Sequence, residues 1–224
     1  MVVISEQLKQ IIADDFNKAS KAKPRRSKVI YASAVGGECR RKLWYDCHNP
    51  DQEEFSFVSA ANMQSGNRAE DLMLLLLRRH PDIHIVETQS KPKGLPEHWG
   101  MKVDAVIEYA GEAMIWEHKE TSRKKFDELL KKQSLVDWNM VYYTQVQIYM
   151  HFFNLSKCLF TVSTEGLRDF TDMIIEYAPT FAKDVVNKAN FIRELETPPD
   201  VSYAPTYWLC KFCIYKERCH GTTA

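Results

Sequence analysis

The sequence predicts a mixed α/β fold, in which a central sheet is covered by helices. Helical and strand-like patterns alternate along the chain, in the order helices, three strands, helices, two strands and a helix. A hairpin pattern occupies residues 100–119, near the middle of the chain. Of the 224 residues, 45% are hydrophobic, which is enough to bury the core of one domain.

The individual elements follow from hydrophobic periodicity and from residues typical of helix ends. Ser33 is the expected cap of the second helix, and Asp137 and Asn139 are alternative caps of the helix that ends near Phe153. A basic connection at 21–28 follows the first helix. The expected helices cover 5–18, 33–47, 59–80, 122–133, 137–153 and 178–195, and the strands outside the hairpin cover 83–89, 158–163 and 170–177.

The hairpin is expected to turn at Ala110-Gly111, between two β-prone arms. Facing residues in an antiparallel pair have numbers with a constant sum, and a turn centred on 110 and 111 gives 221. Asp104 is therefore predicted to face Glu117. Directly opposed like charges destabilise a sheet unless something offsets them. Lys119, two residues beyond Glu117, lies on the same face of its strand.

Two carboxylates and an ammonium group that converge in this way indicate a metal site. Oxygen ligands suit Mg²⁺ or Mn²⁺, and a divalent cation would offset the paired negative charges. This set of groups fits metal-assisted hydrolysis of a phosphodiester, with the lysine orienting water or stabilising negative charge. The structural alternative is a solvated hairpin that carries ordinary surface charges.

Asp104, followed on the next strand by Glu117-His118-Lys119, resembles the signature of the PD-(D/E)xK nuclease superfamily in its RecB-like branch. Val103 stands where the superfamily pattern has proline. The resemblance implies a restriction-endonuclease-like core with a mixed central sheet flanked by helices. It also implies that the backbone carbonyl of His118 joins Asp104 and Glu117 as a metal ligand.

The same resemblance implies a single nuclease domain over residues 1–224. Within it, residues 1–58 form an N-terminal helical segment that carries Cys39, and residues 59–195 form the PD-(D/E)xK core. Residues 196–224 form a C-terminal segment that binds a metal cluster through its cysteines.

Two further motifs match this family by position. Gly66 and Glu70 lie four apart on one helix, as in the Gly-x-x-x-Glu motif of lambda-type exonucleases, whereas CRISPR-adaptation nucleases have histidine there. The resemblance makes Glu70 a metal ligand or a holder of metal-bound water. Gln145 and Tyr149 resemble the Gln-x-x-x-Tyr motif that positions DNA and the active site. The alternative for Glu70 is an ordinary helix carboxylate, and the alternative for Gln145 and Tyr149 is a structural Gln–Tyr pair.

The six cysteines indicate ligation rather than disulfides, because an intracellular chain is expected. Three of them form a C-x2-C-x5-C cluster near the C-terminus, and this spacing fits zinc as well as an iron-sulfur cluster. A complete site needs a fourth ligand. The cluster consists of Cys210, Cys213 and Cys219, and the candidates for the fourth ligand are Cys39, Cys47, Cys158 and His220.

A lone upstream cysteine combined with such a cluster resembles the iron-sulfur nucleases of the AddB and CRISPR-adaptation type. The resemblance implies a structural [4Fe-4S] cluster that ties the N-terminal segment to the C-terminal one. Cys47 and Cys158 are then free thiols that behave as small hydrophobes. The implied cluster ligands are Cys39, Cys210, Cys213 and Cys219.

Overall charge does not favour a nucleic-acid partner, because 30 basic residues balance 30 acidic ones. Short basic runs at 21–28, 40–42 and 123–132 would contact phosphates only near a nuclease site. No apolar run is long enough to span a membrane, and the N-terminus shows no secretion signal, so a cytoplasmic protein is expected.

The expected function is that of an Mg²⁺- or Mn²⁺-dependent deoxyribonuclease, an exonuclease acting on single-stranded DNA or DNA ends. Protein partners in recombination, repair or CRISPR adaptation are consistent with the resemblance. Two alternatives remain: a catalytically inactive DNA- or partner-binding module of the same fold, and a zinc-containing endonuclease.

Overall fold

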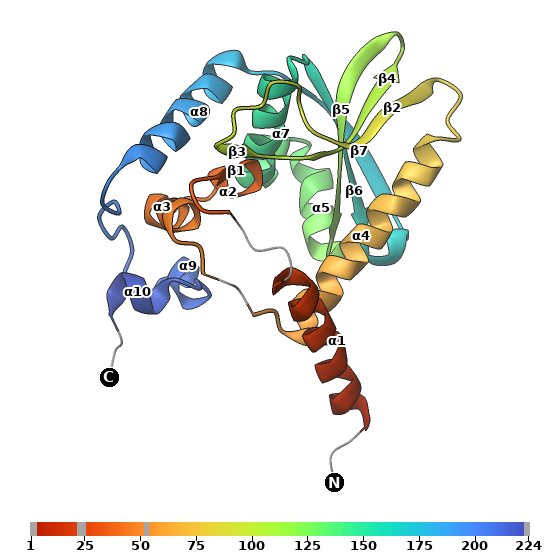
Figure 1. The fold of residues 1–224 in the computed structure, drawn as a ribbon. Helices are drawn as coiled ribbons and strands as arrows, with labels where there is room; N and C mark the ends of the chain where they lie inside the picture. The colour runs from red at the N-terminus through yellow and green to blue at the C-terminus, as the bar shows by residue number, and fades with distance from the viewer. Residues whose placement is uncertain (1–3, 22–25, 52–53, 222–224) are drawn as a thin grey trace.

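The computed structural model describes residues 4–21, 26–51 and 54–221, and its centre is a five-stranded sheet (Figure 1). The strands lie in the order β2-β4-β5-β6-β7. β5 and β6 are parallel, whereas the other neighbouring pairs are antiparallel. The predicted mixed α/β fold is therefore confirmed. The strands are β2 (Ile83–Ser90), β4 (Val103–Tyr109), β5 (Glu112–Thr121), β6 (Lys157–Thr164) and β7 (Phe170–Glu176).

The hairpin formed by β4 and β5 has the predicted register. Ala105 pairs with Trp116, and the numbers of every pair in this ladder sum to 221. Ala110 and Gly111 both have positive φ, at 52° and 78°, as a tight two-residue hairpin turn requires. One step beyond the Ala105–Trp116 pair, this register brings Asp104 opposite Glu117.

Helices cover both faces of the sheet (Figure 1). On one face, Met73 and Leu77 of α4 (Phe57–Leu77) pack against Trp116 and its neighbours on β4, β5 and β6. The other face is covered by α5 (Arg123–Lys132) and α7 (Met140–Phe153), which bury residues such as Phe126 and Val146 against β5 and β6. The helix α8 (Pro179–Glu194) packs against α7, and the short helices α6 (Leu135–Trp138) and η1 (Glu165–Leu167) connect elements.

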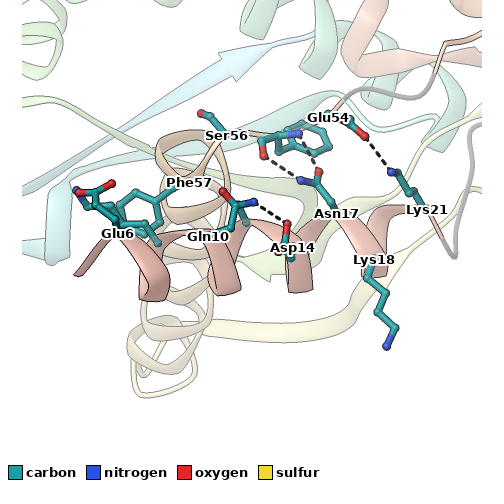
Figure 2. A pocket seen from close by; sticks show the side chains of 12 residues that line it. Glu6, Gln10, Asp14, Asn17, Lys18, Lys21, Glu54, Ser56 and Phe57 are labelled. Atoms are coloured by element: carbon teal, nitrogen blue, oxygen red, sulfur yellow. Dashed lines mark hydrogen bonds and ion pairs between the residues drawn. The ribbon is translucent and has the colours of Figure 1, made fainter. Parts of the chain in front are cut away.

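The first helix, α1 (Ile4–Lys21), is held by the segment that precedes α4 (Figure 2). The Asn17 side chain donates to the Phe55 carbonyl at 3.0 Å and accepts from the Phe55 N–H at 2.8 Å. Lys21 pairs with Glu54 at 3.0 Å. The hollow of about 770 Å³ beside these contacts is lined by mixed charges. Residues 22–25 of the predicted basic connection lie outside the described residues.

The prediction of one helix from Ser33 to Cys47 is wrong. The segment contains two helices, α2 (Ala32–Val35) and α3 (Arg40–His48), and Tyr31 rather than Ser33 precedes the first. Gly36 and Gly37 separate them, and glycine disfavours helix. A Cβ at Gly36 would lie only 2.7 Å from the Val141 backbone, so the break lets α2 approach α7 closely.

Several short elements were not predicted. β1 (Ile30–Tyr31) and β3 (Trp99–Gly100) form a separate two-stranded parallel sheet. Near the C-terminus, α9 (Trp208–Lys211) carries Cys210, α10 (Lys216–His220) carries Cys219, and Cys213 lies between these two helices. The Tyr215 hydroxyl donates to Asp46 at 2.8 Å and so joins this C-terminal segment to α3. None of the helices in the described ranges is long and apolar enough to cross a membrane.

The remaining elements agree with the predictions to within three residues at each end, and the differences of three residues are all at helix ends, where boundaries are least sharply defined. Of the two proposed caps for the helix ending at Phe153, Asn139 is the one that is used. Its side chain accepts hydrogen bonds from the N–H groups of Val141 and Tyr142, at 3.1 and 3.2 Å.

Candidate active site

The predicted site residues come together where β2, β4 and β5 lie side by side. Asp104 lies between Val103, which pairs with Ser90, and Ala105, which pairs with Thr88. Gln89 is therefore the neighbour of Asp104 on β2, as Glu117 is its neighbour on β5.

This row of side chains reaches across the sheet to α4. Gln89 donates to Oε1 of Glu70 on α4 at 2.6 Å. On the other side of Asp104, the His118 N–H donates to Oδ2 of Asp104 at 2.9 Å. The row thus runs from Glu70 through Gln89 and Asp104 to Glu117, and it joins three predicted ligands that are far apart in the sequence.

Glu117 is the most enclosed of these carboxylates, with only 2% of the residue exposed. Its Oε1 accepts from Lys119 Nζ at 2.5 Å and from Gln145 Nε2 at 3.1 Å. Its Oε2 has no hydrogen-bond partner among the described residues, although it is buried. A buried carboxylate oxygen without a partner is costly, so this atom is suited to a cation.

Burial raises the pKa values of all three carboxylates, and repulsion between carboxylates adds to this shift at Glu70 and Glu117. The pKa of Glu70 rises to about 7, mainly because of burial and then because of the charge of Asp104. Burial also raises the pKa values of Asp104 and Glu117, although Lys119 opposes both shifts. Burial is the largest cause of all three shifts, so each carboxylate lies in surroundings that disfavour its charged form.

The pKa of Lys119 is also raised, but for an ammonium group a raised pKa favours the charged form. The carboxylates of Glu117 and Asp104 raise its pKa above the usual range, and they outweigh burial in doing so. The ammonium group also lies 5.5 Å from the ring centre of Tyr142, within cation–π distance. Lys119 is therefore held as a protonated group against the carboxylates.

The helix α7 supplies the two residues of the predicted Gln-x-x-x-Tyr motif. Gln145 Nε2 lies 2.6 Å from the hydroxyl of Tyr149 as well as 3.1 Å from Glu117. Both residues are buried, and burial raises the pKa of Tyr149. The motif therefore contacts the carboxylate site through Glu117.

The imidazole of His118 lies away from this row of carboxylates. Its ring nitrogens lie 2.9 Å from the Thr161 hydroxyl and 3.1 Å from the Ser163 hydroxyl, both on β6. Burial, helped by the charge of Lys119, lowers the pKa of His118 to about 4, so the ring is neutral. The ring is thus a structural group, and only the backbone of His118 lies at the site.

Gln89 and Tyr142 are site neighbours that the sequence reasoning missed. Gln89 has a positive φ of 51°, and a register irregularity precedes it in β2. Such a bulge redirects a side chain, but nothing in the local sequence marks it. Tyr142 precedes Gln145 by three positions on α7, so helical periodicity around the motif could have identified it.

The three carboxylates are chemically suited to bind a divalent cation through oxygen, because a buried oxygen of Glu117 without a partner among the described residues lies near two further carboxylates. The carboxylates are not close enough to one another to form a complete coordination sphere. Across residues 4–21, 26–51 and 54–221, no group of three or more His, Cys, Asp or Glu side chains is close enough to hold a metal ion.

The cysteines predicted as cluster ligands line one cavity of about 90 Å³ between α3 and the C-terminal segment. Cys39 caps α3 and accepts from the Lys42 N–H at 3.4 Å. The pKa of Cys210 is raised by burial and by its three cysteine neighbours. All six cysteines in the chain are free thiols. The four that line this cavity are Cys39, Cys210, Cys213 and Cys219.

The other candidates for the fourth ligand differ in position. His220 also lines the cavity, whereas Cys47 and Cys158 do not. Both of these thiols are fully buried, and burial raises the pKa of Cys47 to about 11. They match the predicted description of small hydrophobic residues.

No family model matches the sequence, and no curated protein matches it either. Solved structures do match. The crystal structure of SSO0001 has a TM-score of 0.61 and 16% identity over 99% of this chain and 100% of that chain. The alkaline exonuclease LHK-Exo from Laribacter hongkongensis has a TM-score of 0.57 and 14% identity over 80% of this chain and 90% of that chain.

A phage-related exonuclease from Haemophilus somnus 129PT is also similar, with a TM-score of 0.52 and 14% identity over 73% of this chain and 79% of that chain. Identities this low show a shared fold. Together with the mixed five-stranded sheet and its flanking helices, they establish that the chain has a restriction-endonuclease-like fold, with alkaline and phage-related exonucleases among its structural neighbours.

Proposed function

We propose that the protein is a metal-dependent DNA nuclease, and that it acts as an exonuclease on single-stranded DNA or DNA ends. The observation that carries the proposal is the environment of Glu117. Its buried carboxylate contacts Lys119 and Gln145 through one oxygen, and its other oxygen has no partner among the described residues. A fold shared with two exonucleases supports the same reaction class.

In this proposal Glu117, Asp104 and Glu70 hold Mg²⁺ or Mn²⁺, together with the backbone carbonyl of His118. Such a cation supplies Lewis acidity toward a phosphoryl oxygen and toward the attacking water. The positive charge of a bound cation would also offset the repulsion by Asp104 and Glu70 that adds to burial in raising the pKa of Glu117.

Lys119 then acts through its positive charge. Because the neighbouring carboxylates raise its pKa, the ammonium group stays protonated at neutral pH and cannot serve as a general base. It can donate hydrogen bonds to a phosphate oxygen or to the attacking water. This donation stabilises the negative charge that develops in the transition state.

Gln145 and Tyr149 position these groups. The Gln145 amide holds Oε1 of Glu117 and is itself fixed by the Tyr149 hydroxyl, at 3.1 and 2.6 Å. A carboxylate that is fixed on one oxygen presents the other in a constant direction. The motif on α7 therefore sets the geometry at the reacting phosphate.

We also propose a structural [4Fe-4S] cluster in the cavity between α3 and the C-terminal segment. Four thiols line this cavity; burial raises the pKa values of Cys210 and Cys213, and the charges of Lys216 and Lys42 respectively oppose these shifts. N–H donation to Cys39 Sγ is typical of cysteines that bind clusters. The alternative is a zinc ion in the same cavity, which would correspond to the second alternative function, a zinc-containing endonuclease.

The test is Mn²⁺ binding measured by calorimetry, together with digestion of linear single-stranded DNA. The wild-type protein should bind Mn²⁺ and digest DNA, and Glu117→Gln should lose both activities while DNA binding in chelator is retained. Glu108→Gln, an exposed change on β4, should behave as wild type. Mn²⁺ binding and DNA affinity without digestion would instead favour an inactive binding module.

A further inference from the structure

A basic groove lies beside the sheet, outside the carboxylate–lysine site. It has a volume of about 800 Å³ and is lined by residues 26–29, 91–92 and 94–99 together with Arg193 of α8. Its cationic side chains come from Arg26, Lys28, Lys91 and Arg193, and Glu97 is its one carboxylate. Four cations against one anion give the groove a clear excess of positive charge.

The cations of the groove form no ion pairs with other residues that the structure describes. Arg193 uses Nε to donate to the Lys28 carbonyl at 3.1 Å, which fixes its guanidinium. Cations that are gathered in a groove without anionic partners attract a polyanion.

The walls of the groove are fixed by the small sheet. β1 pairs with β3 in parallel, so that Ile30 lies beside Trp99, and the Ile30 N–H donates to the His98 carbonyl at 2.8 Å. The Trp99 indole donates to Asn190 on α8 at 3.1 Å. Three segments that are distant in the sequence are thus held together, and the cations are preorganised by the fold.

The groove begins at the edge of the candidate active site. Lys91 directly follows Ser90, which pairs with Val103, the residue before Asp104. Gln89, two positions before Lys91, contacts Glu70. A residue in extended chain spans about 3.3 Å, so one wall of the groove starts within a few residues of the carboxylate row.

We propose that this groove binds the phosphodiester backbone of the DNA strand that extends from the reacting phosphate. The proposal rests on the nuclease function and deepens it, because it assigns a path to the substrate strand. Arg26, Lys28, Lys91 and Arg193 contact successive phosphates without reading sequence. The groove therefore contributes affinity, and the carboxylate–lysine site contributes the reaction.

The test compares two double variants with equal changes in charge. Arg26→Glu with Lys91→Glu reverses two cations of the groove. Arg78→Glu with Arg79→Glu reverses two exposed cations just before β2, at the opposite end of that strand from Ser90. Binding of a labelled single-stranded oligonucleotide is followed by fluorescence anisotropy in chelator over a range of salt, so that no cleavage is needed.

We expect the groove variant to raise Kd about tenfold or more at low salt and to reduce the salt slope by about 1.4, because each single-strand phosphate contact contributes about 0.7. The control variant should keep the wild-type slope. With Mn²⁺, the groove variant should raise KM and leave kcat nearly unchanged. Both variants should keep the wild-type melting temperature.

Equal losses of affinity in the two variants, or wild-type affinity in the groove variant, would overturn the groove as the strand path. If the wild-type protein cleaves no DNA but the groove variant alone loses affinity for DNA, the groove is supported as a DNA-binding site and the nuclease proposal is refuted. Wild-type protein that binds no DNA in chelator would overturn the inference.

Discussion

Lys119 donates to Oε1 of Glu117 at 2.5 Å, across only two positions of β5. The two side chains share one face of the strand, and Gln145 of α7 contacts the same carboxylate oxygen. Lysine and carboxylate therefore form one unit with a fixed geometry, in which the ammonium group is already charged before substrate binds.

Replacing Lys119 by methionine should lower kcat by about 10² to 10³, which is the usual cost of removing one donor that stabilises developing charge. DNA affinity in chelator should fall little, because many phosphate contacts share non-specific binding. Single-turnover digestion of a labelled oligonucleotide measures the rate. Lys124→Met, an exposed change on α5, is the matched control, and wild-type rates in Lys119→Met would refute the role given to this lysine.

Asp104→Asn should stabilise the metal-free protein. Asparagine can still accept from the His118 N–H, which contacts Oδ2 of Asp104 at 2.9 Å, and it removes a like charge next to Glu117. A gain of about 1 kcal/mol corresponds to a rise of about 2–4 °C in melting temperature for a domain of this size. Calorimetry in chelator measures the shift.

Asp104→Ala is the companion to that variant, because it removes the charge and the hydrogen bond together. It should gain less stability than Asp104→Asn. A lower melting temperature for Asp104→Asn than for wild type in chelator would contradict the account of repulsion between these carboxylates.

The pH dependence of stability should include a contribution from His151. Burial and the charge of Lys183 lower its pKa below the usual value of 6.5, and its ring nitrogen lies 2.8 Å from the Tyr177 hydroxyl. The unfolded chain then binds a proton at higher pH than the folded chain does. The resulting stabilisation is present above about pH 6.5 and is lost as the pH falls through the folded-state pKa.

His151→Gln should therefore lose less stability than wild type between pH 7.5 and 5. The difference should be under about 1 kcal/mol, because the ring is partly solvated. Thermal unfolding at several pH values measures it, with His84→Gln on β2 as an exposed control. Identical pH profiles for wild type and His151→Gln would show that this pKa shift has no effect on folding.

The cysteine cavity leads to a comparison of Cys39→Ser with Cys47→Ser. Protein purified without oxygen should be brown and contain about four irons per chain. Cys39→Ser should lose the colour and melt at a much lower temperature. Ligation closes a loop between Cys39 and Cys210, which are 171 positions apart, and such a closure stabilises by up to about 5 kcal/mol.

Cys47→Ser should keep the colour, because Cys47 is buried outside the cavity. Iron analysis and visible absorption distinguish the two variants. If Cys39→Ser stayed brown and Cys47→Ser lost its colour, Cys47 would be the fourth ligand in place of Cys39. A colourless wild-type protein with one zinc per chain would show that the cavity holds zinc and no iron-sulfur cluster.

The hairpin register could be predicted because it depends on local features. The alternation of the two arms and the turn at Ala110-Gly111 fix which residues face each other, and the structure has that register. The fold class could be predicted from the order of helices and strands, because each of these elements has a local hydrophobic pattern. The site residues Asp104 and Glu117 came together as a direct consequence.

The break between α2 and α3 has a local signal that was missed, since Gly36 and Gly37 disfavour a continuous helix, but the reason why glycine stands there is distant. Gly36 is required where α2 approaches the backbone of Val141, more than 100 positions away in the sequence. Gln89 was missed for a similar reason, since its contact with Glu70 depends on an irregularity in β2 and on the docking of α4. Contacts of this kind arise from tertiary packing.

The central claim is tested most directly by digestion of matched linear and circular single-stranded DNA with Mn²⁺, with and without chelator. We expect the wild-type protein to degrade linear DNA, to leave circular DNA intact and to lose all activity in chelator. Cleavage of circular DNA would identify an endonuclease. Failure to cleave either substrate with Mn²⁺, or digestion that persists in chelator, would contradict the assignment of a metal-dependent nuclease site to Asp104, Glu117 and Lys119.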